Sequence, residues 1–364
     1  MIPNTDTRLT ELTIDLVAIA ANWRSLAACT PGAVGAVLKA DAYGTGATQV
    51  APALFNAGCR HFFTAHLQEA LAIRPLIPGA MLAVLNGLPP GGAPDLIAHD
   101  IRPVLGCLAD IAAWSEAARH FGRPLPALLH VDTGMNRLGL APGDVKTLAT
   151  DPSRLDGVTL DYIMTHLASA ECPADPLNDR QRTRFAAACS ILPSAPRSLS
   201  NSSGLFLGPQ FHSDLARPGA ALYGINPTPS LPNPMQAAVQ LRARILQIRD
   251  VPPGETVGYN GQWTATRPSR IATIAVGYAD GFPRSLCNRA VAYFDGSPIP
   301  LVGRVSMDLT TFDVTDAPAA RPGAWLELIG PSILIDEIAV RAETNAYELL
   351  TSLGHRYART YLPA

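Results

Sequence analysis

Val34-Gly35-Ala36-Val37-Leu38 is a short apolar run that ends directly before a lysine, Lys39. A run of this length without polar residues is typical of a strand that is buried on both faces of a parallel sheet. Seven similar runs follow in the first two thirds of the chain: His61–Thr64, Met81–Leu85, Ile101–Leu105, Leu125–Val131, Val158–Thr165, Arg197–Leu199 and one near Leu215.

Helix-length segments separate most of these runs, for example Gln49–Ala57, Leu67–Leu76, Leu108–Phe121 and Asp179–Leu192. Buried strands that alternate with helices indicate parallel pairing, and eight such units predict an α/β fold with a closed (β/α)8 barrel of the TIM type. An open doubly wound sheet is the alternative. It is disfavoured because no GxGxxG motif follows the first run.

The sequence changes character at Asn226–Pro234, where prolines and turn-forming residues follow one another. We interpret this segment as a linker between two domains. Beyond it, a mainly-β pattern with a closing helix near Asn345–Leu353 predicts a second domain. The expected domains are residues 1–230 and 231–364, and the stretch from Thr7 to Ile14 (within residues 1–14) is a candidate strand of the second domain.

Composition excludes several classes of protein. The 48% apolar and 16% charged content is typical of a globular fold, and a net charge of −2 gives no basic surface for nucleic acid or an anionic membrane. Leu16–Ala21 is too short to span a bilayer, and no signal sequence is recognisable, so we expect a cytoplasmic protein. Six scattered cysteines without CxxC or histidine spacing argue against structural zinc and disulfides, and predict buried, reduced thiols and no metal site.

Lys39 is the first candidate for chemistry. An amine at the end of a buried strand loses its proton more easily than one in water, and it can then form a Schiff base with an aldehyde. Taken alone, Lys39 is better explained as a lysine that extends its amine out of a strand end into solvent, and the rest of the sequence is needed to favour the reactive amine.

Other unusual polar residues also follow predicted strands. In a (β/α)8 barrel the reacting groups lie at the carboxyl ends of the strands, and phosphate is commonly bound by the loops after the last two strands. Those two loops contain Asn201-Ser202-Ser203-Gly204 and Arg217-Pro218-Gly219-Ala220, whose backbone N–H groups and hydroxyls can bind a phosphate. Arg137 and His166 follow the fifth and sixth strands.

A series of motifs resembles the alanine racemase family and covers nearly the whole chain in the family's order. The lysine motif is Ala36-Val37-Leu38-Lys39-Ala40-Asp41-Ala42-Tyr43-Gly44. The others are Val131-Asp132-Thr133-Gly134-Met135-Asn136-Arg137-Leu138-Gly139, Thr165-His166, Arg217-Pro218-Gly219, Leu222-Tyr223-Gly224, Gly277-Tyr278-Ala279-Asp280-Gly281 and Val302-Gly303-Arg304-Val305-Ser306-Met307-Asp308.

The resemblance implies a pyridoxal 5'-phosphate enzyme that interconverts L- and D-alanine and supplies D-alanine for peptidoglycan. It also implies a homodimer whose active sites take residues from both chains. Racemisation needs one acid–base group on each face of the substrate's α-carbon. By resemblance, Lys39 serves D-alanine and Tyr259 of the partner serves L-alanine, with His166 and Arg217 stabilising the Tyr259 phenolate.

The resemblance assigns further roles within the site. Arg217 would hydrogen-bond the pyridine nitrogen and, because guanidinium keeps its protons, would weaken the electron sink and suppress side reactions. Arg137 would orient the substrate carboxylate, while Met307, Asp308 and Tyr278 would close or gate the substrate pocket. The residues implied to bind the cofactor are Lys39, Tyr43, His166, Asn201, Ser202, Arg217, Gly219, Ala220 and Tyr357.

Three positions depart from the family's pattern. His130 stands where many members have a lysine, often carbamylated, that positions the following arginine. A neutral His130 imidazole can accept a hydrogen bond from Arg137 but brings less negative charge, so we expect Arg137 to depend on a bound anion or another group. Ser198 replaces a histidine that is often found near the ring arginine. Near the C-terminus, either His355 or Tyr357 could take the position of a phosphate-binding tyrosine.

Alternative functions remain open from the sequence. One is a racemase of different or broader specificity, for serine or basic amino acids. A barrel-type decarboxylase is disfavoured by Arg217. A non-catalytic pyridoxal-phosphate carrier would share the lysine motif but would be a single barrel without the second domain.

Overall fold

The computed structural model describes residues 7–363, which form two compact units. One unit, the barrel unit, comprises Ile19–Leu222 and Asn226–Gln236. The other, the β unit, comprises the described residues up to Ala18, Tyr223–Ile225 and those from Ala237 onward. Residues 1–6 of the expected first domain and residue 364 of the expected second lie outside the described part of the chain.

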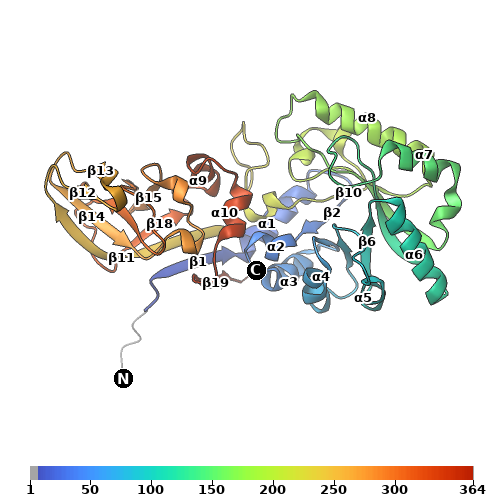
Figure 1. The fold of residues 1–364 in the computed structure, drawn as a ribbon, viewed down its shortest axis with the longest axis horizontal. Coiled ribbons are helices and arrows are strands. Elements are labelled where there is room, and N and C mark those ends of the chain that lie inside the picture. Colours follow the sequence, from blue (N-terminus) through green and yellow to red (C-terminus); the bar gives the residue numbers. More distant parts are fainter. Residues whose placement is uncertain (1–6, 364) are drawn as a thin grey trace, which may run out of the picture. The chain divides into compact units, whose positions relative to one another are not determined.

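The barrel unit is built on a ring of parallel strands (Figure 1). Its strands are β2 (Ala33–Val34), β3 (Ala36–Val37), β4 (His61–Thr64), β5 (Met81–Val84), β6 (Ile101–Leu105), β7 (Leu125–His130), β8 (Val158–Met164), β9 (Arg197–Ser198) and β10 (Leu215–Ala216). Strands β3 to β9 pair in chain order, and β10 pairs with β2. The Arg217 N–H donates to Ser200 O at 2.9 Å, which links the ends of β10 and β9.

Gly35 divides the first barrel strand into β2 and β3, so the ring has eight strands. A Cβ at Gly35 would lie 2.9 Å from His61 O, and only glycine therefore permits this close approach to β4. The predicted (β/α)8 barrel is confirmed, and the open doubly wound alternative is wrong because β10 returns to the first strand.

Helices cover the outside of this ring (Figure 1). They are α1 (Leu16–Ala27), α3 (Ala47–Ala57), α4 (Leu67–Ile73), α5 (Ala93–Ala98), α6 (Leu108–Phe121), α7 (Pro142–Thr150) and α8 (Pro176–Ile191). The short segment α2 (Lys39–Tyr43) is instead a turn with left-handed φ values at the carboxyl end of the first strand. The inside is filled by one buried side chain from nearly every strand: Val37, Phe63, Ala83, Val104, Leu128, Met164 and Leu215. The seventh strand contributes a polar residue instead, the fully buried Ser198.

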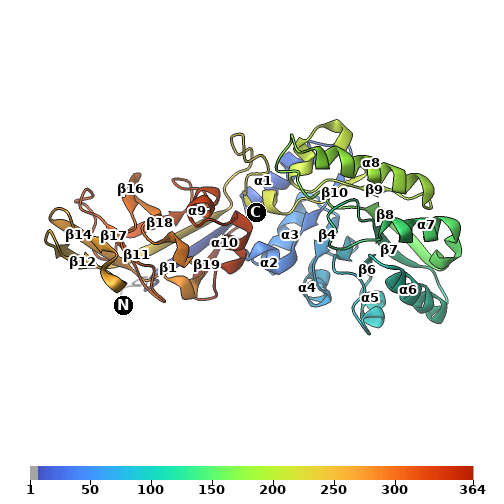
Figure 2. The same cartoon turned by 45° about the horizontal axis from the view of Figure 1, so that its top comes forward.

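The β unit contains the remaining strands (Figure 2). They are β1 (Thr10–Asp15), β11 (Val239–Val251), β12 (Thr256–Val257), β13 (Trp263–Thr264), β14 (Ser269–Ile274), β15 (Val291–Phe294), β16 (Ser297–Pro300), β17 (Thr310–Asp313), β18 (Trp325–Ile329) and β19 (Ala358–Leu362). Its helices are α9 (Ile335–Arg341) and α10 (Ala346–Ser352). The predicted mainly-β character of this region is confirmed.

Strand β11 organises the β unit. Its first half pairs antiparallel with β1 and β18, and its second half pairs with β14 after an irregularity between Ile245 and Gln247. The alternation of buried and partly exposed residues along β1 places Leu12 and Ile14 in the core. The first described strand thus lies in the same sheet as residues more than two hundred positions away in the sequence.

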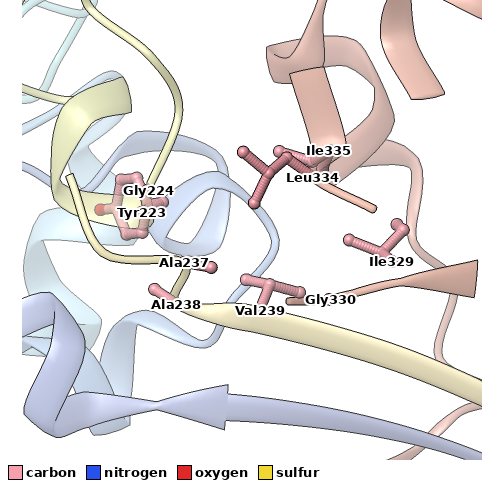
Figure 3. Close-up of a pocket in the computed structure, with 9 residues that line it drawn as sticks. All are labelled: Tyr223, Gly224, Ala237, Ala238, Val239, Ile329, Gly330, Leu334 and Ile335. Carbon is pink, nitrogen blue, oxygen red and sulfur yellow. The ribbon is translucent and has the colours of Figure 1, made fainter. Parts of the chain in front are cut away.

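The β unit also encloses a small cavity (Figure 3). Side chains of Val239, Ile329, Leu334 and Ile335 and the chain at Tyr223 line it. Its volume of about 10 Å³ is enough for roughly one water molecule. The cavity is therefore too small for a substrate or a cofactor, and we exclude it as the functional site.

All six cysteines are free thiols. The prediction that they are buried is wrong for Cys107 and Cys172, which are exposed. Cys107 is exposed because it lies at the surface start of α6, where its Sγ accepts the Asp110 N–H at 3.4 Å. Among the described residues, no helix is long and apolar enough to cross a membrane.

Candidate active site

Lys39 lies at the carboxyl end of the first barrel strand, where the backbone makes an unusual turn. The four residues from Ala40 to Tyr43 all have φ between 53° and 55°, which is the left-handed helical region. Each L-residue in this conformation costs roughly 1–2 kcal/mol. The turn closes through Ala42 N–H to Leu38 O at 2.8 Å, and the Asp41 carboxylate accepts the Ala47 N–H at 2.7 Å.

The Lys39 amine is half-buried and lies among charged groups. Burial and, secondarily, the positive charge of Arg137 lower its pKa from the ordinary value of 10.5, while Glu69 opposes this shift. Lowering the pKa increases the fraction of free amine at neutral pH, and the free amine is the nucleophile that forms a Schiff base. The structure thus supports a reactive Lys39 over a lysine that extends freely into solvent.

Arg217 follows the eighth strand and is buried in the barrel, with 3% of its surface exposed. Its guanidinium donates to Ser198 Oγ and to Thr165 O, and Ser198 in turn donates to Leu215 O at 2.7 Å. Burial lowers the pKa of Arg217 to about 10, so it remains a cation at neutral pH. A guanidinium has five N–H donors, and these two oxygens do not use all of them. The remaining N–H groups of Arg217 can donate to another acceptor.

Two histidines near this cation are neutral. Burial, then Arg217 and Arg137, lower the pKa of His166 to about 3. Burial and then Arg217 lower the pKa of His130 to about 4. Both imidazoles can therefore accept a hydrogen bond at neutral pH but do not carry charge.

Arg137 is exposed at the end of the loop after β7. Among the described residues, no hydrogen bond joins it to His130. Both residues line the same cavity of about 250 Å³, together with Leu138 and Asp110. Arg137 is expected to need a partner because His130 replaces the family's lysine. The His130 imidazole does not provide this partner by a direct hydrogen bond.

The loops after the seventh, eighth and first strands meet at Ser202. Its Oγ accepts the N–H groups of Gly219 at 3.0 Å and of Ala221 at 3.3 Å. A Cβ at Gly219 would lie 2.4 Å from the Tyr43 hydroxyl, so these residues form a cradle that only glycine leaves open. Burial raises the pKa of Tyr43 to about 12, and its hydroxyl therefore stays a donor.

This cradle fits a phosphate group. The N–H groups of Gly219 and Ala221 point at Ser202 Oγ, and the Tyr43 hydroxyl lies beside Gly219, so donors of the kind that bind phosphate in such barrels are gathered at one place. Ala221, whose N–H is one of the two, was not identified from the sequence, which named Ala220. Asn201 lies beside the cradle and bonds the backbone, donating to Leu167 O at 3.3 Å and accepting the Gly204 N–H at 2.9 Å.

The remaining sequence-predicted residues belong to the β unit. Tyr259, Tyr278 and Met307 are exposed by 68%, 45% and 55%. The N–H groups of Tyr278 and Ala279 donate to Ser306 O and Met307 O, both at 3.0 Å. These two motifs, far apart in the sequence, therefore form one structural element of the β unit.

An ion-pair network adjoins that element. Arg356 lies 2.7 Å from an Asp308 oxygen and 3.1 Å from an oxygen of the buried Asp280. The sequence did not indicate this role for Arg356. Tyr357 is 3% exposed, whereas His355 is exposed, and the Tyr357 hydroxyl has no hydrogen-bond partner among the described residues.

Comparison with known proteins identifies the family. The model of the alanine racemase N-terminal domain matches residues 14–227, and that of the alanine racemase C-terminal domain matches residues 238–361. This chain belongs to the alanine racemase family. The predicted resemblance is therefore confirmed, and the two matched regions together include all the candidate residues described above.

Individual relatives agree with this assignment. The alanine racemase of Acidiphilium cryptum is 58% identical over 96% of this chain and 97% of its own, and a catabolic alanine racemase of Mesorhizobium japonicum is 47% identical over 96% and 93%. The crystal structure of alanine racemase from Bartonella henselae with covalently bound pyridoxal phosphate is 40% identical. It superimposes with a TM-score of 0.94 over 97% of this chain and 99% of its own.

Proposed function

We propose that this protein is an alanine racemase that uses pyridoxal 5'-phosphate to interconvert L- and D-alanine. The observation that carries the proposal is the position of Lys39. A lysine with a lowered pKa lies at the end of the first barrel strand, in the same unit as a cradle of N–H groups and hydroxyls suited to a phosphate. A phosphorylated aldehyde is the ligand class that these two features require together.

Residues of the barrel unit would hold the cofactor. Ser202 and the N–H groups of Gly219 and Ala221 would bind its phosphate, with Tyr43 as a further donor. We expect Asn201, Ala220 and His166 of this unit, together with Tyr357 of the β unit, to complete the binding site. When bound, the cofactor supplies the electron-withdrawing system that acidifies the hydrogen on the α-carbon of an amino acid.

Arg217 would donate to the ring nitrogen of the cofactor. A guanidinium cannot give up its proton at working pH, even with a pKa lowered to about 10. The nitrogen it faces would therefore stay largely unprotonated, which limits the electron demand and favours proton return over decarboxylation or transamination. The fixed positions of Ser198 and Thr165 support this orientation of Arg217.

Two groups would move the proton. Lys39 would exchange it on one face of the α-carbon, serving D-alanine, and Tyr259 of a second copy would exchange it on the other face, serving L-alanine. The ring N–H of the neutral His166 would donate a hydrogen bond to the Tyr259 phenolate, with Arg217 as the nearby cation. Arg137, Met307, Asp308 and Tyr278 would orient the substrate carboxylate and close the pocket.

We further propose a cytoplasmic homodimer that supplies D-alanine for peptidoglycan. The exposure of Tyr259, Tyr278 and Met307 supports a second copy as the partner of these residues, because their side chains are accessible to another chain. Related proteins carry both catabolic and biosynthetic names. Growth of a D-alanine auxotroph that expresses this chain would test its capacity for the biosynthetic role.

The direct test is solvent deuterium incorporation at the α-carbon, followed for a panel of L-amino acids with chiral separation of the products. We expect exchange and racemisation of alanine, and loss of both by about 10²–10⁴-fold in Lys39→Ala. Lys146→Ala is the matched control, since Lys39 and Lys146 are the only two lysines of the sequence. A yellow protein that leaves every α-hydrogen in place would be a carrier, and preferential turnover of serine or a basic amino acid would change the substrate.

Tyr259→Phe tests the second base. We expect deuterium exchange from L-alanine to fall by about 10²–10⁴-fold, because phenylalanine cannot take or return a proton, while cofactor binding is retained. The measurement is the initial exchange rate from each enantiomer separately. Turnover within a few-fold of the parent would place the second base on another residue.

A further inference from the structure

Glu69 joins the start of α4 to the turn that follows Lys39. Its Oε2 accepts the N–H groups of Ala65 at 2.9 Å and His66 at 3.1 Å, which are at the N-terminal end of α4. Its Oε1 accepts the Ala40 N–H at 2.6 Å. One side chain of the second β/α unit therefore binds the backbone directly after the reactive lysine of the first.

The contact with Ala40 fixes the point at which the left-handed turn begins. Ala40 is the first of the four residues with positive φ. Inside the turn, N–H groups of residues after Ala40 donate to carbonyl groups at its start; for example, the Gly44 N–H donates to Ala40 O at 2.8 Å. The Ala40 N–H is directed instead at Glu69, so this bond connects the turn to the rest of the barrel unit.

The contact requires a carboxylate. Three N–H donors converge on the two oxygens of Glu69, and an ionised carboxylate is the side chain that only accepts hydrogen bonds. A glutamine would place its own N–H₂ group against at least one of these donors. The negative charge also faces Lys39, whose other charged or titratable neighbours are Arg137 and His166.

We propose that Glu69 is a positioning residue for Lys39, which anchors the left-handed turn through Ala40 and thereby fixes the direction of the amine. The proposal rests on the function proposed for Lys39. A purely structural role, in which Glu69 only caps α4, is the alternative that an experiment must separate from it. Among the charged groups near Lys39, Glu69 is the one that opposes the lowering of its pKa.

Two variants test the length and the charge of the Glu69 side chain separately: Glu69→Asp shortens it and keeps the charge, and Glu69→Gln keeps the length and removes the charge. Aspartate is one methylene shorter, so it can keep the bonds at the start of α4 but cannot also reach Ala40. We expect the thermal midpoint of Glu69→Asp to stay near the parent's and kcat for alanine to fall by about 10–100-fold with KM changed only a few-fold. Asp175→Ala is the matched control, because Asp175 accepts the Leu177 N–H at 2.8 Å at the start of α8 in the same unit.

The second readout does not depend on activity. Competitive acetylation of the cofactor-free full chain, analysed by mass spectrometry, reports the reactivity of Lys39 relative to Lys146, the only other lysine. Removing the charge of Glu69 in Glu69→Gln should lower the pKa of the Lys39 amine further. We expect the Lys39-to-Lys146 labelling ratio at neutral pH to rise about 3–10-fold in Glu69→Gln and to remain unchanged in Asp175→Ala.

The outcomes distinguish the two hypotheses. If both Glu69 variants lose thermal stability as Asp175→Ala does but keep the parent's labelling ratio and kcat, Glu69 is only a helix cap and the inference is wrong. If instead Lys39→Ala retains racemisation, the function proposed for Lys39 fails, whatever the Glu69 variants show. A changed labelling ratio together with a lowered kcat supports the inference.

Discussion

Burial is the main reason why His166 and His130 have pKa values below the ordinary value of 6.5. Each lies close to Arg217, and burial and cationic neighbours act in the same direction on its pKa. The same reasoning applies to Lys39, where burial and Arg137 favour the free amine. The cations Arg217 and Arg137 thus coexist with two neutral imidazoles that can accept hydrogen bonds.

A consequence is acid sensitivity of the fold. Below the ordinary pKa of 6.5 the unfolded chain protonates His130, whereas the folded chain does so only near pH 4, so stability falls as the pH falls through this window. By pH 5 this histidine alone should reduce the free energy of unfolding by about 2 kcal/mol.

His130→Gln tests this prediction. Urea unfolding at pH 7 and pH 5 should show a smaller loss of stability on acidification in the variant than in the parent, by about 2 kcal/mol. Equal losses in the two proteins would mean that His130 titrates at its ordinary pKa in the folded chain.

At the scale of elements, the site is assembled by loops that follow the first, seventh and eighth strands. Ser202, Gly219 and Ala221 meet because β9 and β10 are neighbours, and Tyr43 reaches them because β10 also pairs with the first strand. The closure of the barrel therefore creates the cradle. Gly219 is required there by space and not by backbone conformation, since a Cβ would collide with the Tyr43 hydroxyl.

Gly219→Ala should therefore weaken cofactor binding by about tenfold or more, because the added methyl displaces Tyr43 from the cradle. Titration of the cofactor-free chain by the change in visible absorbance measures this affinity. Gly143→Ala, where a Cβ would meet no atom within 4 Å, is the matched control and should bind as the parent does. Equal affinities in both variants would contradict the proposed position of the phosphate.

At the scale of the whole molecule, the chain contains two units that each hold part of the proposed machinery. Lys39 and Arg217 belong to the barrel unit, and Tyr259 and Met307 belong to the β unit. The proposed dimer predicts that each active site combines the barrel unit of one copy with Tyr259 of the other. This arrangement can be tested without a structure of the complex.

Mixed dimers of Lys39→Ala and Tyr259→Phe chains provide the test. If each site takes Lys39 from one copy and Tyr259 from the other, one of the two sites in a mixed dimer has both native residues. We expect dimers purified through two different tags to recover about half of the parental turnover. Mixed dimers no more active than either variant alone would show that both bases come from the same copy.

Much of the barrel was predictable because its strands are local patterns. A strand buried on both faces is mainly apolar, so the runs from His61, Ile101 and Leu125 are visible in the sequence and confirmed in the structure. In the β unit, β12, β13, β17, β19 and α9 were not predicted. Strands β17 and β19 have partly polar, half-buried sequences whose pairing depends on β14 and β1.

The site residues that directly follow barrel strands were predicted from the sequence. Contacts between side chains that are far apart in the sequence were not. Glu69 carried a signal as an acidic residue in the first turn of a helix, which predicts a cap but not the contact with Ala40. The Arg356 network and the Ala221 N–H carried no comparable signal. The partner that Arg137 requires opposite His130 was an open question in the sequence and is not answered by a direct contact.

The sequence by itself determined the family, the order of strands and helices in the barrel and the candidate lysine, because these depend on residue types at short spacing. Only the tertiary structure decided that the barrel closes, that Ser202, Gly219 and Tyr43 form one cradle, and that Lys39 and His166 have lowered pKa values. Burial and the mutual distances of charged groups are properties of residues that are far apart in the chain. No local pattern encodes them.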